Sequence, residues 1–213
     1  PDISELDFNP VMIKDGQALL VDARMLVSRS ATPSPKHLVI SPYPSDQQKT
    51  IEIKDGRSVF LRPVKPEDSP MFRDFFYILS PTTIYYRFFS PLKEIKPEML
   101  ARFTQIDYDR EIALVAVQIE DGKEKMLGVA RVIGDPDGSF GEFSVLVGDP
   151  WQGQGIGALL LQECLDIARS RKFKSIMGLV LAENKNMLAL GKKLGFKIER
   201  DPDGGAMELY MTF

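Results

Sequence analysis

The spacing of apolar and polar positions predicts three helices between Pro66 and Thr104, followed by strands. From Pro66 onward, apolar side chains recur at helical spacing and form a core-facing stripe. The members of that stripe are Met71, Phe72, Phe75, Phe76 and Leu79. Ser80-Pro81 is typical of a helix start, with serine as the cap, and Pro97 to Thr104 predicts a third helix.

After residue 111 the period changes from helical to alternating. Apolar runs at 112–119, 126–133 and 140–147 are separated by short turns, which predicts an antiparallel meander. A further hairpin is predicted at 50–62, where Ile51 and Ile53 alternate against Val59 and Leu61 around Asp55-Gly56.

The last third of the chain predicts a helix, a strand at 175–181, a helix from Met187 to Leu194 and a closing hairpin of 196–200 and 207–212. The first of these helices has a predicted buried face of Leu159, Leu160, Leu161, Cys164, Leu165 and Ala168. Cys164 within that stripe is expected to be a core thiol and not a nucleophile.

Gly141 to Leu160, GEFSVLVGDPWQGQGIGALL, joins the meander to this helix. It predicts a strand, a turn with three glycines in five residues, and a helix start, where free N–H groups and the helix dipole favour phosphate. The turn lacks the Gly-Lys-Ser/Thr of a P-loop, and the short turns before it do not make a parallel βαβ unit. The stretch therefore predicts a different kind of anion site.

The pattern Gln152-x-x-Gly155-x-Gly157, after a strand and opening a helix, resembles the pyrophosphate-binding signature of the GNAT N-acetyltransferases. The segment from Asn184 through Lys193-Leu194-Gly195-Phe196 resembles that family's second signature. The resemblance implies an α+β fold with a mixed, mostly antiparallel sheet flanked by helices. It also implies acetyl-CoA as co-substrate, without a metal.

Carried onto this sequence, the resemblance places the pantetheine arm along Val145, Leu146 and Val147. It places the pyrophosphate on the backbone of Gln152, Gly153, Gln154, Gly155, Ile156, Gly157 and Ala158. Asn184 matches an asparagine near the pantetheine arm, and it is equally well explained as a plain helix cap. Gly191 stands where many GNAT enzymes have a tyrosine that protonates the leaving thiolate, so water or another residue would have to do so here.

The first residues, Glu5-Leu6-Asp7-Phe8-Asn9-Pro10, resemble the end of the ATP-grasp domain of ADP-forming acyl-CoA synthetases, with Asn9 and Asp22 at metal-ligand positions. So short a piece cannot form a nucleotide site, and we expect it to be an inactive remnant. The expected organisation is a remnant at 1–27, a proline-rich linker at 28–49 and a GNAT domain at 50–213. Because position 1 is proline, we expect the sequence to be cut from a longer protein.

The composition of the chain limits its expected partners and its expected location in the cell. A net charge of −3 and the lack of a basic stripe argue against a nucleic-acid partner. A single cysteine fits a reducing compartment, and the sequence has no signal peptide or membrane-spanning run, so we expect a cytoplasmic protein with no membrane partner.

Glu142 is the candidate general base. Strand alternation puts it on the face of Ser144 and Leu146, just before the stretch expected to hold the thioester. The lone histidine, His37, falls in the linker, and Asp135, Asp137 and Asp149 fall in turns that should be solvated. Five polar residues could also line a substrate surface, although ordinary solvated surface is the more common location: Tyr85, Tyr86, Arg87, Asp107 and Tyr108.

Within the family, Glu-Phe-x-Val-x-Val before the loop and the fused first piece most resemble bacterial Pat-type protein lysine acetyltransferases. That resemblance implies Glu142 as base and, as partner, a protein bearing a reactive lysine, such as an AMP-forming acyl-CoA synthetase. Two alternatives stay open. The chain could acetylate a small amine by the same chemistry, or it could be a non-catalytic acetyl-CoA sensor.

Overall fold

The computed structural model describes residues 3–29, 41–53, 56–135, 139–201 and 204–213, and the chain divides into two compact units, Pro1–Pro42 and Tyr43–Phe213. Residues 30–40 of the predicted linker, with His37, lie outside the described residues. The larger unit begins at Tyr43, whose hydroxyl donates to the carbonyl of Pro63 at 3.1 Å and whose ring meets Tyr108 edge-on at 5.6 Å.

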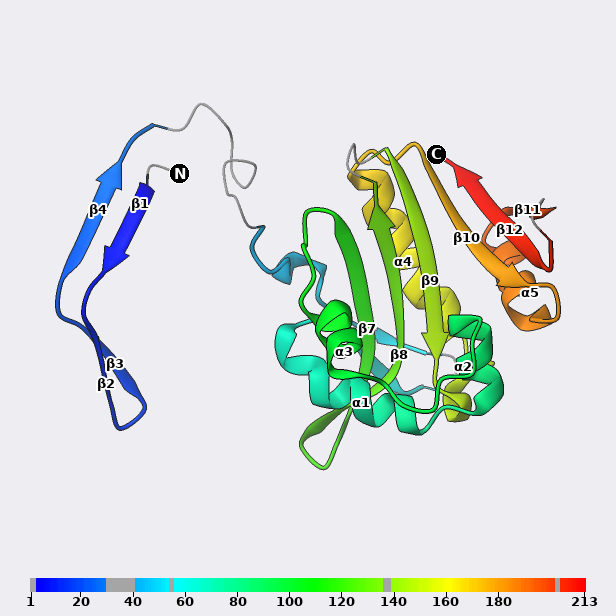
Figure 1. Cartoon of the computed structure of the whole chain (residues 1–213), viewed down its shortest axis with the longest axis horizontal. Coiled ribbons are helices and arrows are strands. Elements are labelled where there is room, and N and C mark those ends of the chain that lie inside the picture. The colour runs from blue at the N-terminus through cyan, green and yellow to red at the C-terminus, as the bar shows by residue number, and fades with distance from the viewer. Residues whose placement is uncertain (1–2, 30–40, 54–55, 136–138, 202–203) are drawn as a thin grey trace. The chain divides into compact units, whose positions relative to one another are not determined.

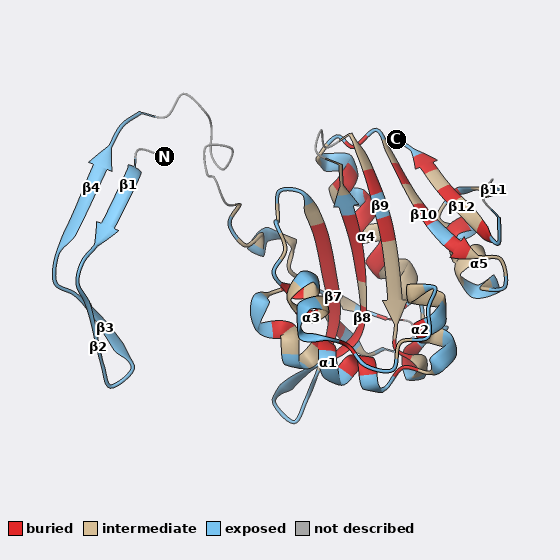
Figure 2. Ribbon diagram, viewed as in Figure 1, coloured by how far each residue is buried: buried red, intermediate tan, exposed pale blue. Residues whose placement is uncertain are grey.

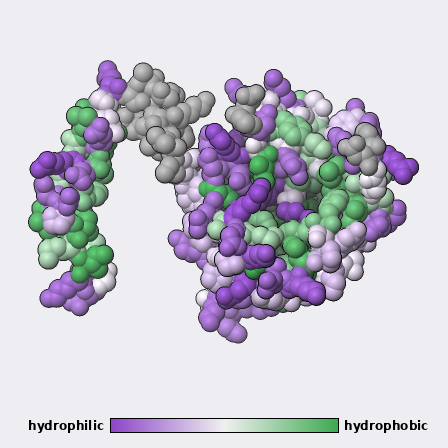
Figure 3. Space-filling view, viewed as in Figure 1, coloured by the Kyte–Doolittle hydropathy of each residue, from purple (hydrophilic) through white to green (hydrophobic). Residues whose placement is uncertain are grey.

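The first unit is an antiparallel ribbon that is two strands wide and consists of two consecutive strand pairs. The pairs are β1 (Ile3–Phe8) with β4 (Ala23–Val27), and β2 (Val11–Lys14) with β3 (Gln17–Leu20). The ribbon turns at Asp15-Gly16, with φ of 52° and 74°. Between β3 and β4 the strand is interrupted at Val21 and Asp22, where the facing Pro10 has no N–H to donate. Every described residue of the ribbon is exposed, including the apolar ones that colour it green in Figure 3.

The larger unit is built on an eight-stranded sheet in the order β11-β12-β10-β9-β8-β7-β6-β5 (Figure 1). The strands are β5 (Lys49–Glu52), β6 (Ser58–Pro63), β7 (Glu111–Glu120), β8 (Lys123–Gly134), β9 (Phe140–Val147), β10 (Ser175–Leu181), β11 (Lys197–Arg200) and β12 (Ala206–Thr212). All neighbouring pairs are antiparallel except β9 with β10, which is parallel. The mixed sheet confirms the expected fold class.

Helices cover both faces of this sheet. In Figure 1, α1, α2 and α3 lie in front of the strands and α4 lies behind them. Their bounds are α1 (Ser69–Tyr77), α2 (Pro81–Phe88), α3 (Pro97–Thr104), α4 (Ile156–Ser170) and α5 (Lys185–Lys193), with short 3₁₀ turns at Ser45–Gln47, Pro66–Asp68 and Asp149–Trp151. The core lies between sheet and helices, and Figure 2 shows buried positions along the middle of β7 and β8.

Most local predictions are confirmed. Ser80 caps α2 by accepting from the N–H of Thr83, and the predicted helix at Pro97 and strand at Ser175 have the observed bounds. One prediction needs correction: Leu159 is only partly buried. At about 100° per residue it falls outside the arc of α4 that Leu160, Cys164 and Ala168 share. Asp55, Asp137 and Asp203 of the predicted turns lie outside the described residues.

Candidate active site

The central sheet opens between β9 and β10. The two strands pair only at Phe140, Gly141 and Glu142, opposite Ser175–Met177, although β9 runs on to Val147 and stays paired with β8 on its other edge. Within the described chain, the β10-facing edge of residues 143–147 therefore has no strand partner. Backbone groups on such an edge can pair with an extended ligand as another strand would.

The glycine loop follows at the end of this open edge. Gly153 and Gly155 have φ of +74° and +93°, and β-carbons placed on them would meet nothing within 4 Å. The backbone N–H groups from Gly153 to Ala158 donate to no acceptor among the described residues. Six consecutive free donors at the start of a 15-residue helix make a concentrated site for an anion. The residues present therefore fit a pyrophosphate.

Side chains around the loop hold its shape. Gln152 Nε2 donates to the carbonyl of Val147 at 3.1 Å and to Thr83 Oγ1 at 3.2 Å. Gln154 Nε2 donates to the carbonyl of Pro150 at 2.9 Å, while its Oε1 accepts from Arg57. The side-chain amides of Gln152 and Gln154 thus hold the loop in shape.

Asp149 ties the loop to helix α2. It accepts from the backbone N–H of Ser80 at 2.9 Å, from Ser80 Oγ at 2.7 Å and from Thr83 Oγ1 at 2.8 Å. Burial alone would raise the pKa of Asp149, but these hydrogen bonds outweigh burial and hold its pKa below the usual value. The expectation that Asp149 is a solvated turn residue is therefore wrong, because its partners lie about seventy positions away in the sequence.

Glu142 lies exposed where β9 and β10 part, on the face of β9 that also carries Ser144 and Leu146. Phe143 points the other way and packs against Phe196 with ring centroids 4.8 Å apart. The charge of Glu142 is felt by Arg87 of α2, whose pKa it raises against a larger opposing effect of burial. This carboxylate is thus available to solvent and substrate beside the open edge.

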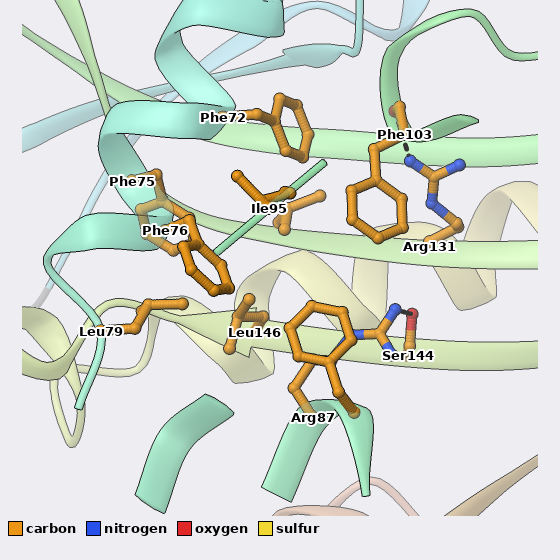
Figure 4. Close-up of a pocket in the computed structure, with 12 residues that line it drawn as sticks. Phe72, Phe75, Phe76, Leu79, Arg87, Ile95, Phe103, Arg131, Ser144 and Leu146 are labelled. Atoms are coloured by element: carbon orange, nitrogen blue, oxygen red, sulfur yellow. Dashed lines mark hydrogen bonds between the residues drawn. The ribbon is translucent and has the colours of Figure 1, made fainter. Parts of the chain in front are cut away.

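An apolar pocket lies next to this face, under α1, α2 and α3 (Figure 4). Its cavity volume is about 40 Å³, and its walls include Phe72, Phe75, Phe76, Phe88, Phe103 and Leu146. Two cations, Arg87 and Arg131, project into the same end of it. Arg87 donates to Ser144 Oγ at 3.1 Å. Burial and repulsion from Arg131 lower the pKa of Arg87 to about 10.

Arg87 is one of the five polar residues that the sequence suggested as a possible substrate surface. Of the others, Tyr108 is structural, since its hydroxyl donates to the carbonyl of Val64 at 2.8 Å, and Tyr85 is exposed. The sequence did not single out Arg131. An arginine in the middle of an apolar strand, where charge is costly unless paired, was the signal that could have marked it.

Asn184 directly precedes helix α5, and Gly191 lies within it. Asn184 caps it, because Oδ1 accepts from the N–H of Met187 at 3.1 Å. The helix-cap explanation is confirmed, and a role beside the pantetheine arm stays a prediction. A β-carbon on Gly191 would lie 2.2 Å from Cδ2 of the fully buried Leu209, so the absence of a side chain there is a packing requirement.

The lone cysteine is confirmed as a core thiol. Cys164 is fully buried, and burial raises the pKa of its thiol to about 12. Across the described ranges, no group of three histidine, cysteine, aspartate or glutamate side chains is placed to hold a metal ion. None of the described helices has the length and hydropathy of a membrane span.

Comparison with known proteins agrees with this geometry. The model of the acetyltransferase (GNAT) family matches residues 78–196. Acetyltransferase PA5475 of Pseudomonas aeruginosa is 34% identical over 158 residues, which are 74% of this chain and 85% of that protein. Acetyltransferase Pat of Mycolicibacterium smegmatis is 27% identical over 158 residues, but these are only 46% of that protein.

Two solved structures show the same fold. The GNAT domain of S. lividans PAT matches with a TM-score of 0.74 at 24% identity, over 81% of this chain and all of that one (100%). YncA of Salmonella typhimurium, solved with its cofactor acetyl-CoA, matches with a TM-score of 0.59 at 18% identity, over 72% of this chain and 93% of that one.

The family model and the 34% identity to acetyltransferase PA5475 define the class of this protein as an acyltransferase. The chain belongs to the GNAT acetyltransferase family. It is an acetyl-CoA-dependent N-acetyltransferase, with acetyl-CoA as its co-substrate.

Proposed function

We propose that this protein transfers the acetyl group of acetyl-CoA to a lysine side-chain amine of another protein, with Glu142 as the general base. The observation that carries the proposal is the position of Glu142. It is exposed at the point where β9 leaves β10, at the end of the open edge, on the face of β9 whose Ser144 and Leu146 line the pocket.

The same proposal assigns acetyl-CoA to the open edge and the loop. The pantetheine arm lies along residues 145–147, where β9 has no β10 partner, and the pyrophosphate is held by the backbone of 152–158, in which the N–H groups of 153–158 are free to donate. Gly157 supports this assignment, because a β-carbon there would lie 3.3 Å from Val147 Cγ2 and 3.9 Å from Val145 Cγ2. Glycine thus lets the helix start approach β9 without displacing these side chains.

A base is needed because the acceptor amine is protonated in water. A lysine amine with a pKa of about 10.4 is neutral in only about one molecule in 10³ near pH 7, which corresponds to roughly 4 kcal/mol. Glu142 takes the proton that the amine loses as its nitrogen bonds to the acetyl carbon. The carbon–sulfur bond breaks, and the thiolate takes a proton from water, since Gly191 offers no hydroxyl.

The test compares Glu142→Gln with Glu98→Gln, which removes a charge of the same kind from an exposed position on α3. We expect Glu142→Gln to keep its affinity for acetyl-CoA in calorimetry and to lose about 10²-fold or more in turnover. Glu98→Gln should match the parent in both measurements. Turnover by Glu142→Gln within a few-fold of the parent from mildly acidic to mildly alkaline pH would end the proposal.

The choice of a protein acceptor rests on the likeness to Pat-type enzymes, including the 27% identity to acetyltransferase Pat. An AMP-forming acyl-CoA synthetase is the first acceptor to test, by intact mass after incubation with acetyl-CoA, beside a panel of amino acids and polyamines. Efficient turnover of the small amines without a modified protein would replace this acceptor class.

The ribbon of residues 3–29 completes the proposal. We infer that it is the inactive end of an ATP-grasp domain, joined by a linker to the acetyltransferase domain. Its exposed apolar side chains support this, since a two-stranded ribbon without a core is incomplete as a folded unit. The single cysteine supports a reducing, cytoplasmic setting.

A further inference from the structure

The two cations of the pocket beneath α1, α2 and α3 are neutralised to different degrees. Arg131 of β8 forms an ion pair with Glu111 at 2.6 Å and donates to the carbonyl of Phe103 at 2.5 Å. Its guanidinium also lies over the ring of Phe103, 5.7 Å from the centroid. Arg131 is therefore a satisfied structural cation.

Arg87 is compensated less, because the charge of Glu142 acts on it only from beyond ion-pair distance. Its hydrogen bond goes to the neutral hydroxyl of Ser144, and its guanidinium lies over the ring of Phe88 at 5.2 Å. Among the described residues, no carboxylate lies within ion-pair distance of Arg87. A guanidinium has five N–H donors, and withdrawing a cation from water without an anionic partner is costly. The apolar lining and the nearby Arg131 increase that cost.

The position of Arg87 connects it to the reaction. Arg87 contacts Ser144, and Glu142 lies two residues away on the same face of β9. An anion bound at Arg87 would therefore lie near the carboxylate that deprotonates the acceptor amine. This arrangement suits one molecule that carries both an anionic group and the amine.

We propose that Arg87, positioned by Ser144, is the carboxylate subsite of the acceptor site and selects an acceptor that carries a carboxylate near its reactive amine. This inference rests on the proposed function. In a protein acceptor the carboxylate belongs to an acidic side chain beside the lysine. The carboxylate restores the pairing that Arg87 lacks, and the guanidinium fork binds it through two hydrogen bonds.

The experiment uses acceptor pairs that differ only in the carboxylate. One pair is Nα-acetyl-lysine and its C-terminal amide, and the other is a capped Glu-Lys peptide and its Gln-Lys counterpart. A charged hydrogen bond contributes enough for a preference of about tenfold or more, so we expect kcat/KM to favour the carboxylate by that factor in at least one pair. Where turnover is slow, calorimetric binding of the same compounds to the protein with acetyl-CoA is compared.

Three variants assign that preference to the residue. Arg87→Met should reduce the ratio within a pair to about one, and Arg87→Lys should keep part of it, because it keeps the charge without the fork. Arg73→Met removes the same charge from an exposed position on α1 and should leave the ratio unchanged. Melting temperature and acetyl-CoA affinity confirm that each variant is folded.

Equal kcat/KM and equal binding within both pairs for the unmodified protein would overturn the inference, and that comparison needs no variant. A preference that survives Arg87→Met would also overturn it. So would an Arg87-dependent preference for succinyl-CoA over acetyl-CoA with neutral acceptors, because the carboxylate would then come from the acyl donor. Failure of this inference can be told apart from failure of the proposed function. The Glu142→Gln variant tests the base through turnover, whereas the ratio of kcat/KM within an acceptor pair tests only Arg87.

Discussion

Replacing Gly191 by alanine sets two effects against each other. In a helix interior, alanine is favoured over glycine by about 1 kcal/mol, so propensity alone predicts a more stable protein. The structure predicts the opposite. The new β-carbon would lie 2.2 Å from Cδ2 and 3.2 Å from Cγ of Leu209, which is 0% exposed on β12. Carbon atoms pack at about 3.5–4.0 Å, so a fully buried side chain would have to move by about 1.3 Å or change rotamer.

Overpacking of this kind costs about 1–3 kcal/mol, and a displacement greater than 1 Å in a closed core belongs at or above the upper end. After subtracting the gain in propensity, we expect Gly191→Ala to lower the free energy of unfolding by about 2 kcal/mol and the melting temperature by about 4–8 °C. Urea unfolding followed by circular dichroism measures the first quantity, and calorimetry measures the second.

A double-mutant cycle with Leu209→Ala is the internal control. Leu209→Ala alone should cost about 2–5 kcal/mol, and in the Gly191→Ala background it should cost clearly less, because the added methyl group occupies part of the vacated space. Gly191→Tyr should fail to fold stably and should not restore an acid at this place. If Gly191→Ala is as stable as the parent or more stable, the reasoning from the Leu209 contact is refuted.

Four further predictions concern the loop, its anchor, the core thiol and the first unit. Gly155→Val should abolish acetyl-CoA binding in calorimetry, since φ of +93° disfavours any side chain and the new one would project into the open space above the N–H groups. Unaltered affinity would show that the glycine loop is not the pyrophosphate site. Asp149→Asn should destabilise the protein near neutral pH by urea unfolding. Because the pKa of Asp149 is lowered by folding, its contribution is present above the unfolded value of about 3.9 and is lost as the pH falls below it, so the difference from the parent should shrink there, and a constant difference would contradict us. Cys164 should resist thiol reagents near pH 8 until the protein unfolds, because its pKa is raised to about 12 by burial, and rapid labelling of the native protein would exclude that burial. A chain that begins at Tyr43 should keep the melting temperature and the transfer activity, measured by calorimetry and CoA release, whereas loss of either, or ATP binding by the full chain, would show that the ribbon has a role.

The sequence by itself determined the elements and their order. Helical spacing of apolar residues, the Ser80-Pro81 cap and the alternation in the meander act over a few neighbouring positions, so they could be recognised without the fold. The glycine loop was recognised for the same reason, because its special backbone conformations are written in consecutive residues. Glu142 could be assigned to a strand face, although its role as base stays a prediction.

Only the tertiary structure decided what lies beside these elements. Asp149 meets Ser80, and Arg87 meets Ser144, across wide gaps in the sequence, and no local pattern encodes such contacts. The sequence showed that Gly191 stands where related enzymes have a tyrosine. Only the structure shows why a side chain is absent there, because Leu209 of β12 fills the space. The parting of β9 from β10 was also invisible, because pairing between strands depends on long-range packing and not on the residues of either strand alone.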